Sequence, residues 1–130
     1  MKNTYLAVAA LGLLAAGTLP ASAADCDESC LKKVMDTYLQ ALARHDASSL
    51  PLAKNVRYTE NGAELDVGKD GLWVTFNSYG TYRHDVFDPS TGGVATYVNL
   101  TENHEVPFPD LLAVRLKVVR DRITTPPGEV

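Results

Sequence analysis

The stretch VRYTENGAELDV, residues 56–67, decides the fold class, because the spacing of apolar residues changes there to a strand period. Two runs that alternate apolar and polar side chains, residues 56–60 and 63–67, flank the pair Asn61-Gly62. Asn-Gly between such runs is the strongest short signal for a β-hairpin, since a type I′ turn needs positive φ at both central positions. We therefore predict an antiparallel hairpin here.

An amphipathic helix is predicted upstream of this hairpin, over residues 28–44. Its apolar residues recur at helical spacing and form one stripe: Leu31, Val34, Met35, Tyr38, Leu39 and Leu42. Asp25 and Glu28 have the spacing of a capping box at its start. A short turn or second helix is expected over residues 48–53.

Antiparallel strands are predicted downstream of residue 67. Residues 81–87 and 94–100 form a second hairpin, and residues 111–119 alternate apolar side chains with small or charged ones. Residues 72–76 fit a short helix and a strand equally well. A helix followed by mostly antiparallel strands predicts an α+β domain, with the helix packed on one face of a curved sheet.

The first residues have the pattern of a signal peptide, which we assign to residues 1–23. Lys2 precedes an uncharged apolar run over residues 5–19, and Ala21-Ser22-Ala23 supplies small residues for cleavage. The run is shorter than the 20 or so residues that span a bilayer, so a retained anchor is the less favoured alternative. We expect one secreted or periplasmic domain over residues 24–130, with no membrane contact after cleavage.

Composition argues against nucleic acid as a partner. The chain carries a net charge of -4, and loss of Lys2 makes the mature chain more acidic still. Its cations are scattered and often adjacent to acids, as in Lys69-Asp70 and Arg120-Asp121, whereas phosphate backbones are bound by clustered cations.

Cys26 and Cys30 lie four residues apart, in a chain expected to reach an oxidising compartment. One helical turn brings such positions close to disulfide geometry, so a bond between them would hold the first turn of the helix. A redox or metal-binding pair is the alternative. It is less favoured because redox pairs usually have C-x-x-C spacing and zinc needs further ligands.

Several strings carry a resemblance to a known family. They are C-x-x-x-C-L at residues 26–31, LPLAKN at 50–55, VRYTENG at 56–62, GLW at 71–73 and RLKV at 115–118. Together they resemble secreted proteins of the nuclear transport factor 2-like, or SnoaL-like, superfamily. The string VRYTENG is the most specific of them, and the resemblance extends to Ile123.

The resemblance implies a cone-shaped domain in which a bent, mostly antiparallel sheet wraps around the long first helix and encloses an apolar pocket. Relatives include isomerases, dehydratases and polyketide cyclases as well as non-catalytic modules, and many are dimers, so a homodimer is an expected partner state. Relatives continue after Ile123 into another strand. Here Pro126 and Pro127 exclude a long one, so the final strand is expected to be missing.

His84, Tyr58 and Glu60 are the candidate catalytic residues. His84 lies within a predicted strand, and histidine titrates near working pH. Tyr58 and Glu60 alternate on one strand and share a face, where a phenol could stabilise an oxyanion and the carboxylate could act as base. The alternative is structural: an exposed strand histidine, and an ordinary pair on a solvated sheet face.

Arg115, Trp73, Tyr82 and Tyr97 are the candidate ligand-binding residues. Arg115 could hold an anionic group, or form a surface salt bridge instead. The three aromatic residues could stack a ligand, although large aromatic side chains are first of all core material. Core packing is also the favoured role of Tyr38.

No motif indicates a metal or a cofactor, because the histidines are spread over separate elements and no phosphate-binding glycine loop occurs. Asn99-Leu100-Thr101 matches a glycosylation sequon, which matters only in a host that glycosylates exported proteins. We expect a secreted pocket for an apolar or aromatic ligand, as in a cofactor-free lyase, dehydratase or isomerase. The alternative is a non-catalytic binding or dimerising module.

Overall fold

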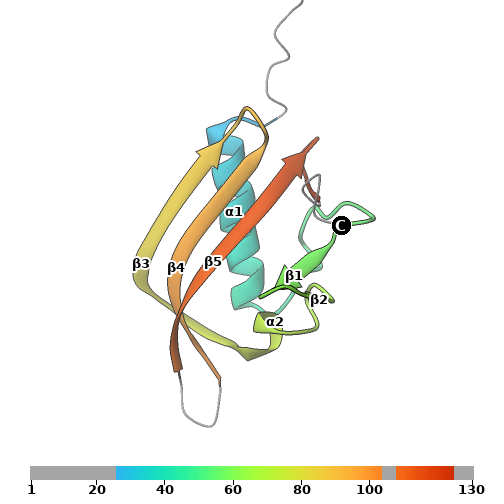
Figure 1. Ribbon diagram of the computed structural model, residues 1–130. Helices are drawn as coiled ribbons and strands as arrows, with labels where there is room; N and C mark the ends of the chain where they lie inside the picture. Colours follow the sequence, from blue (N-terminus) through green and yellow to red (C-terminus); the bar gives the residue numbers. More distant parts are fainter. Residues whose placement is uncertain (1–25, 104–107, 125–130) are drawn as a thin grey trace, which may run out of the picture.

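Figure 1 shows the computed structural model, which describes residues 26–103 and 108–124. One long helix packs on a four-stranded antiparallel sheet of order β3-β4-β5-β6, and a separate hairpin pairs β1 with β2. The elements are α1 (Glu28–Ala43), β1 (Tyr58–Glu60), β2 (Ala63–Leu65), α2 (Leu72–Thr75), β3 (Phe76–Asp88), β4 (Gly93–Glu102), β5 (Phe108–Val119) and β6 (Arg122–Thr124). The described chain is thus an α+β domain, as predicted, and its sheet does not close into a barrel.

Helix α1 forms where the apolar stripe predicts it. The stripe is buried against the sheet, with Leu31, Met35 and Leu42 fully shielded from solvent. The helix is capped by Asp27, whose side chain accepts a hydrogen bond from the Cys30 backbone N–H at 2.9 Å. The cap is therefore Asp27, where the capping-box spacing points to Asp25, which lies outside the described residues.

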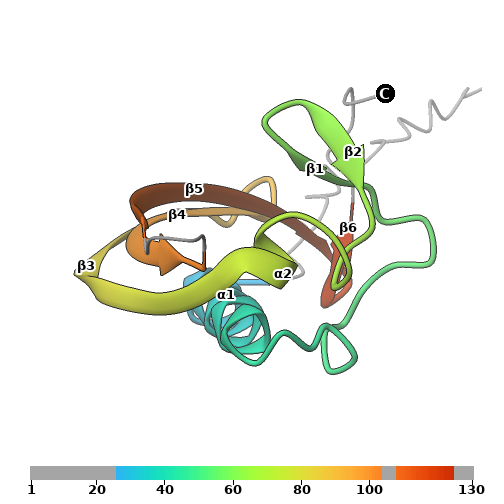
Figure 2. The same ribbon diagram turned by 90° about the horizontal axis from the view of Figure 1, so that it is seen from below.

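The four-stranded sheet is covered by α1 on one face only (Figure 2). Alternate residues of β4, among them Thr96 and Val98, point toward the helix and are buried. The intervening residue Tyr97 is 44% exposed and pairs with His84 of β3 in the sheet register. Tyr97 and His84 therefore share the outer face, away from α1.

An irregularity interrupts the β3–β4 register between Tyr79 and Arg83. The side chain of Asn99 in β4 stabilises this bulge. Its Oδ1 accepts a hydrogen bond from the Tyr82 backbone N–H at 2.9 Å. The Asn99 side chain lies where a Cβ atom at position 80 would be, so Gly80 is required for this contact.

The turns follow the sequence prediction closely. Asn61 and Gly62 both have positive φ, as the type I′ hairpin requires, and Arg120 and Asp121 adopt the same combination between β5 and β6. The undecided stretch 72–76 contains both forms, since α2 is one helical turn and β3 begins at Phe76. Residues 48–53 contain turns and an isolated bridge but no helix.

The sheet ends in the three-residue strand β6, which pairs with β5 only through residues 117–119. The residues that follow, 125–130, lie outside the described range, as do the predicted signal peptide and His104. No helix within residues 26–103 and 108–124 is long and apolar enough to cross a membrane.

Candidate functional site

A cavity of about 470 Å³ lies between β5 and the β1–β2 hairpin, on the side where α1 contributes Tyr38. Figure 2 shows the hairpin standing beyond β5, away from β3. About half of the wall is apolar, and its apolar side chains include Leu52, Val56, Val67, Leu72, Leu100, Leu112, Val114, Leu116 and Ile123. This volume falls within the range of small-molecule sites, which combine an apolar wall with a few polar groups.

Tyr58 and Glu60 form the polar group on the hairpin side of the cavity. Alternation along β1 directs both side chains to one face, and the Tyr58 hydroxyl donates a hydrogen bond to Oε1 of Glu60. The same oxygen accepts a second hydrogen bond, 2.8 Å long, from the backbone N–H of Leu72 at the start of α2. The Glu60 carboxylate is thus fixed by two donors from different elements.

Tyr38 extends this polar chain from the helix. Its side chain is only 5% exposed, and its hydroxyl interacts with that of Tyr58. Burial, followed by the hydrogen bond to Glu60, raises the pKa of Tyr58 well above its ordinary value. Burial and the nearby charge of Glu60 likewise raise the pKa of Tyr38. Both phenols therefore keep their protons and can act as hydrogen-bond donors near neutral pH.

Gly71 permits this arrangement. It has positive φ (58°) at the residue before α2, and a Cβ atom at this position would overlap the Glu60 carboxylate. The glycine therefore allows close approach of the backbone to the carboxylate that Leu72 binds.

His84 does not join Tyr58 and Glu60 in the described structure. It lies on the outer face of β3 and is not among the residues that line the cavity. The reason is the strand alternation, which directs Asp85 to the helix side, where it contacts Arg83 and Thr96, and His84 to the opposite side. The prediction that the three residues act together is corrected accordingly, while the shared face of Tyr58 and Glu60 is confirmed.

The predicted aromatic ligand-binding residues lie elsewhere too. Trp73 is 1% exposed and packs edge-on against Tyr38, with ring centroids 5.5 Å apart, so it belongs to the core. Tyr97 faces solvent on the outer face, and Tyr82 is 52% exposed beside a smaller groove between α1 and β3. None of these three aromatic residues lines the main cavity.

Arg115 does line the cavity, from the exposed side of β5. Three further charged residues line the wall and are not predicted from the sequence: Arg57, Glu102 and Asp110. Arg57 forms an ion pair with Glu64 across the hairpin at 3.0 Å. Their place in the cavity depends on how the hairpin stands against β5, for which strand periodicity carries no signal.

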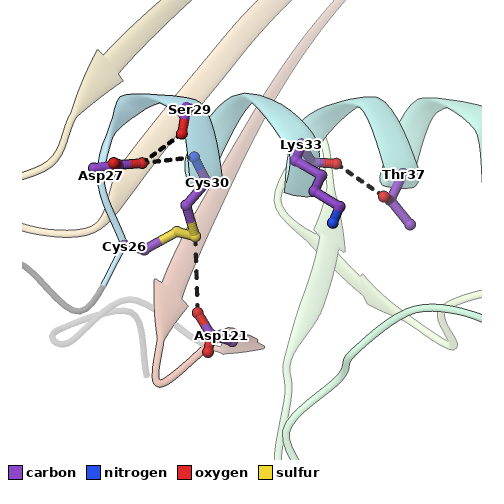
Figure 3. Close-up of a disulfide and its surroundings, with 7 residues drawn as sticks. All are labelled: Cys26, Asp27, Ser29, Cys30, Lys33, Thr37 and Asp121. Atoms are coloured by element: carbon purple, nitrogen blue, oxygen red, sulfur yellow. Dashed lines mark hydrogen bonds between the residues drawn. A yellow bond between two sulfur atoms is a disulfide. The ribbon is translucent and has the colours of Figure 1, made fainter.

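The predicted disulfide between Cys26 and Cys30 is present, with Cα atoms 5.2 Å apart (Figure 3). It closes the first turn of α1 beside the cap residue Asp27. Figure 3 also places Asp121, from the turn between β5 and β6, next to the sulfur of Cys30, with Oδ1 at 3.7 Å from Sγ. The start of α1 and the end of the sheet therefore meet at the disulfide.

Comparison with known proteins gives one match. The family model described as Domain of unknown function (DUF8021) matches residues 25–124, which is most of the chain and includes every residue of the cavity wall. No curated protein and no solved structure matches the chain.

Proposed function

The chain belongs to the DUF8021 family, whose description names no function, and we propose from the geometry of the cavity that it binds a small apolar or aromatic molecule there. One observation carries the proposal: the hydrogen-bonded chain Tyr38–Tyr58–Glu60 lies in the wall of a cavity of about 470 Å³, and about half of that wall is apolar. Apolar walls supply affinity, and a few fixed polar groups select a ligand by its hydroxyl or carbonyl group.

The ligand chemistry follows from the protonation of the two phenols. The hydroxyl protons of Tyr38 and Tyr58 lie in the hydrogen bonds of the chain Tyr38–Tyr58–Glu60, so a ligand carbonyl or hydroxyl oxygen accepts one of them by replacing the present acceptor, and the Glu60 carboxylate can accept from a ligand hydroxyl. Arg115 supplies a cation in the same wall and suits a ligand that also carries an anionic group. A phenol or a hydroxylated cyclic ketone meets these requirements.

A catalytic form of the proposal assigns Glu60 as base and Tyr58 as the donor that turns its proton from Glu60 to a developing oxyanion. This is the chemistry of a cofactor-free lyase, dehydratase or isomerase. The competing proposal is a non-catalytic binding or dimerising module, in which the same side chains only hold the hairpin to the helix. Turnover that disappears in Glu60→Gln separates the two.

Superfamily and location belong to the proposal as well. A helix on one face of a curved antiparallel sheet, with a cavity beside it, supports the likeness to the nuclear transport factor 2-like superfamily at the level of architecture. The disulfide supports the proposal that the protein acts outside the cytoplasm, because such bonds persist in oxidising compartments.

The test is thermal unfolding of the purified protein against phenolic, steroidal and terpenoid compounds. A ligand at one hundred times its dissociation constant adds about 2.7 kcal/mol to the free energy of unfolding. Tyr58→Phe should weaken binding by about fivefold, since it removes a hydrogen bond worth about 1 kcal/mol.

Tyr97→Phe is the matched control, because it removes a phenol hydroxyl from the outer face of the sheet. His84→Ala tests the outer face in the same way and should leave ligand binding unchanged. If no compound of the panel shifts the unfolding of a cooperatively folded protein, the pocket proposal fails and the interaction module is favoured.

A further inference from the structure

A second cluster of chemically active groups lies outside the cavity, where α1 begins. Cys26 and Cys30 each offer a sulfur and Asp121 a carboxylate oxygen, and these three atoms lie within 4.8 Å of one another. Cys30 lies in the first turn of α1 and Cys26 just before it, whereas Asp121 is 91 residues from Cys30, in the turn between β5 and β6. Folding thus supplies the third ligand that the cysteine pair lacks in sequence.

The spacing of these groups suits a zinc ion. With Zn–S bonds of about 2.3 Å and Zn–O bonds of about 2.0–2.2 Å, neighbouring ligand atoms of a tetrahedral site lie roughly 3.5–4 Å apart. Oδ1 of Asp121 lies 3.7 Å from Sγ of Cys30. The two sulfurs are bonded to each other in the disulfide, and would separate to a comparable distance once that bond is broken.

The turn that carries Asp121 is well defined. Arg120 and Asp121 have φ of 50° and 59°, the combination of a type I′ turn, and the strands on both sides are paired through residues 117–119 and 122–124. Cys26 is buried, Cys30 is partly exposed and Asp121 is exposed, so an ion can reach the cluster from solvent on the side of Cys30 and Asp121.

We propose that reduction of the Cys26–Cys30 disulfide creates a zinc site formed by the two thiolates and the carboxylate of Asp121. A dithiol reductant supplies two electrons and two protons, the S–S bond breaks, two thiols form, and the reductant becomes a disulfide. Zinc then displaces the two thiol protons, and a water molecule completes the tetrahedron. The oxidised protein has no thiolate and does not bind the ion in this way.

The site selects its ion by ligand chemistry. Two thiolates favour zinc and other thiophilic ions over magnesium and calcium, which take oxygen ligands. Three protein ligands leave one position open, as in zinc sites that bind a further molecule. None of the three ligands lines the cavity, so the zinc site is independent of the function proposed for the cavity.

The experiment is a titration of the purified protein with Zn²⁺ before and after reduction by a phosphine, followed by calorimetry, with Co²⁺ absorption as a second probe. We expect one zinc per chain in the reduced protein, thiolate-to-cobalt absorption with Co²⁺, and neither signal in the oxidised protein. Asp121→Asn should lower the zinc affinity by at least about tenfold, since even changes outside the ligand sphere commonly cost that much.

Asp121→Asn keeps the turn, because asparagine readily adopts positive φ. Asp46→Asn is the matched control: Asp46 is an exposed acid in the loop after α1, and its variant should bind zinc as the native protein does. The double variant Cys26→Ser with Cys30→Ser should show no cobalt–thiolate absorption under any condition.

Three outcomes would overturn the proposal. The first is equal zinc binding by the oxidised and reduced proteins. The second is an Asp121→Asn variant that binds as tightly as the native protein, which would leave the cysteines as a pair without the carboxylate. The third is loss of the circular dichroism signal of the fold on reduction that zinc does not restore.

Discussion

The hydroxyl of Tyr79 in β3 donates a hydrogen bond to the backbone carbonyl oxygen of Leu39 in α1, at a distance of 2.7 Å. This bond ties the middle of the helix to the sheet next to the β3 bulge. We predict that Tyr79→Phe lowers the free energy of unfolding by about 1 kcal/mol, the usual contribution of such a bond. Urea unfolding measures the change.

Tyr82→Phe is the control for this prediction, since Tyr82 is a half-exposed tyrosine of the same strand. The two variants remove the same atom from the same strand. Equal effects in the two variants would show that the contact with Leu39 contributes nothing to stability.

A charged network beside this bond predicts how stability depends on pH. Burial raises the pKa of Asp36 and of Asp85, but hydrogen bonds outweigh this effect and leave both pKa values below the ordinary value. Asp36 accepts hydrogen bonds from Lys32 and Arg83. Asp85 accepts them from Arg83 and Thr96. A carboxyl group with a lowered folded pKa stabilises the fold above its unfolded pKa of about 4, and this stability is lost as the pH falls.

Arg83→Met should therefore cost about 1 kcal/mol near pH 7, where both carboxylates are charged, and less below pH 4, where they are protonated. Urea unfolding between pH 3 and pH 7 measures the difference between variant and native protein. Lys33→Met, which removes an exposed cation from α1, should give a small difference. A cost for Arg83→Met that stays constant over this range would contradict the network.

Gly71→Ala tests the support of the cavity. The new Cβ atom would displace the Glu60 carboxylate, so ligand binding should weaken by about tenfold or more in addition to the loss of about 1–2 kcal/mol for an alanine at positive φ. Gly62→Ala is the matched control, because Gly62 also has positive φ but no atom lies within 4 Å of the place that its Cβ would take. The Gly62→Ala variant should lose stability and keep its ligand affinity. Equal ligand affinities in Gly71→Ala and Gly62→Ala would count against Glu60 as a binding group.

Removal of the disulfide should have a modest effect on stability. The bond closes a loop of only a few residues, for which the chain-entropy relation gives about 2 kcal/mol. We predict this loss for the double variant Cys26→Ala with Cys30→Ala, measured by urea unfolding without reductant. A chain that no longer folds would mean that the disulfide holds more than the first turn of α1.

The sequence predicts the elements of this fold well, because each is set by a local pattern. The stripe of α1 and the Asn61-Gly62 turn need only a few neighbouring residues to be recognised. The candidate site is predicted in part. Tyr58 and Glu60 share a face because they alternate on one strand, whereas the separation of His84 from them depends on which face α1 covers.

Two groups of contacts could not be predicted, because they join distant parts of the chain. Tyr38 meets Tyr58 only once the hairpin stands against the helix, and periodicity alone assigns Tyr38 to the core. Asp121 reaches Cys30 only after the sheet is complete. For both contacts, the local sequence pattern predicts which face of a helix or strand a residue lies on, but it does not predict which other element packs against that face.

The position of Asn99 has a consequence for the time at which this chain could be modified. Its side chain carries the nitrogen of the sequon Asn99-Leu100-Thr101, and that side chain lies over Gly80 with its Oδ1 bonded to the Tyr82 backbone N–H once β3 and β4 have paired. The hydrogen bond uses the oxygen of the amide, whereas a sugar would be joined to its nitrogen. In a host that glycosylates exported proteins, pairing of this hairpin and transfer of the sugar would compete, and the faster event would decide whether the chain matures bare or with a sugar beside the bulge.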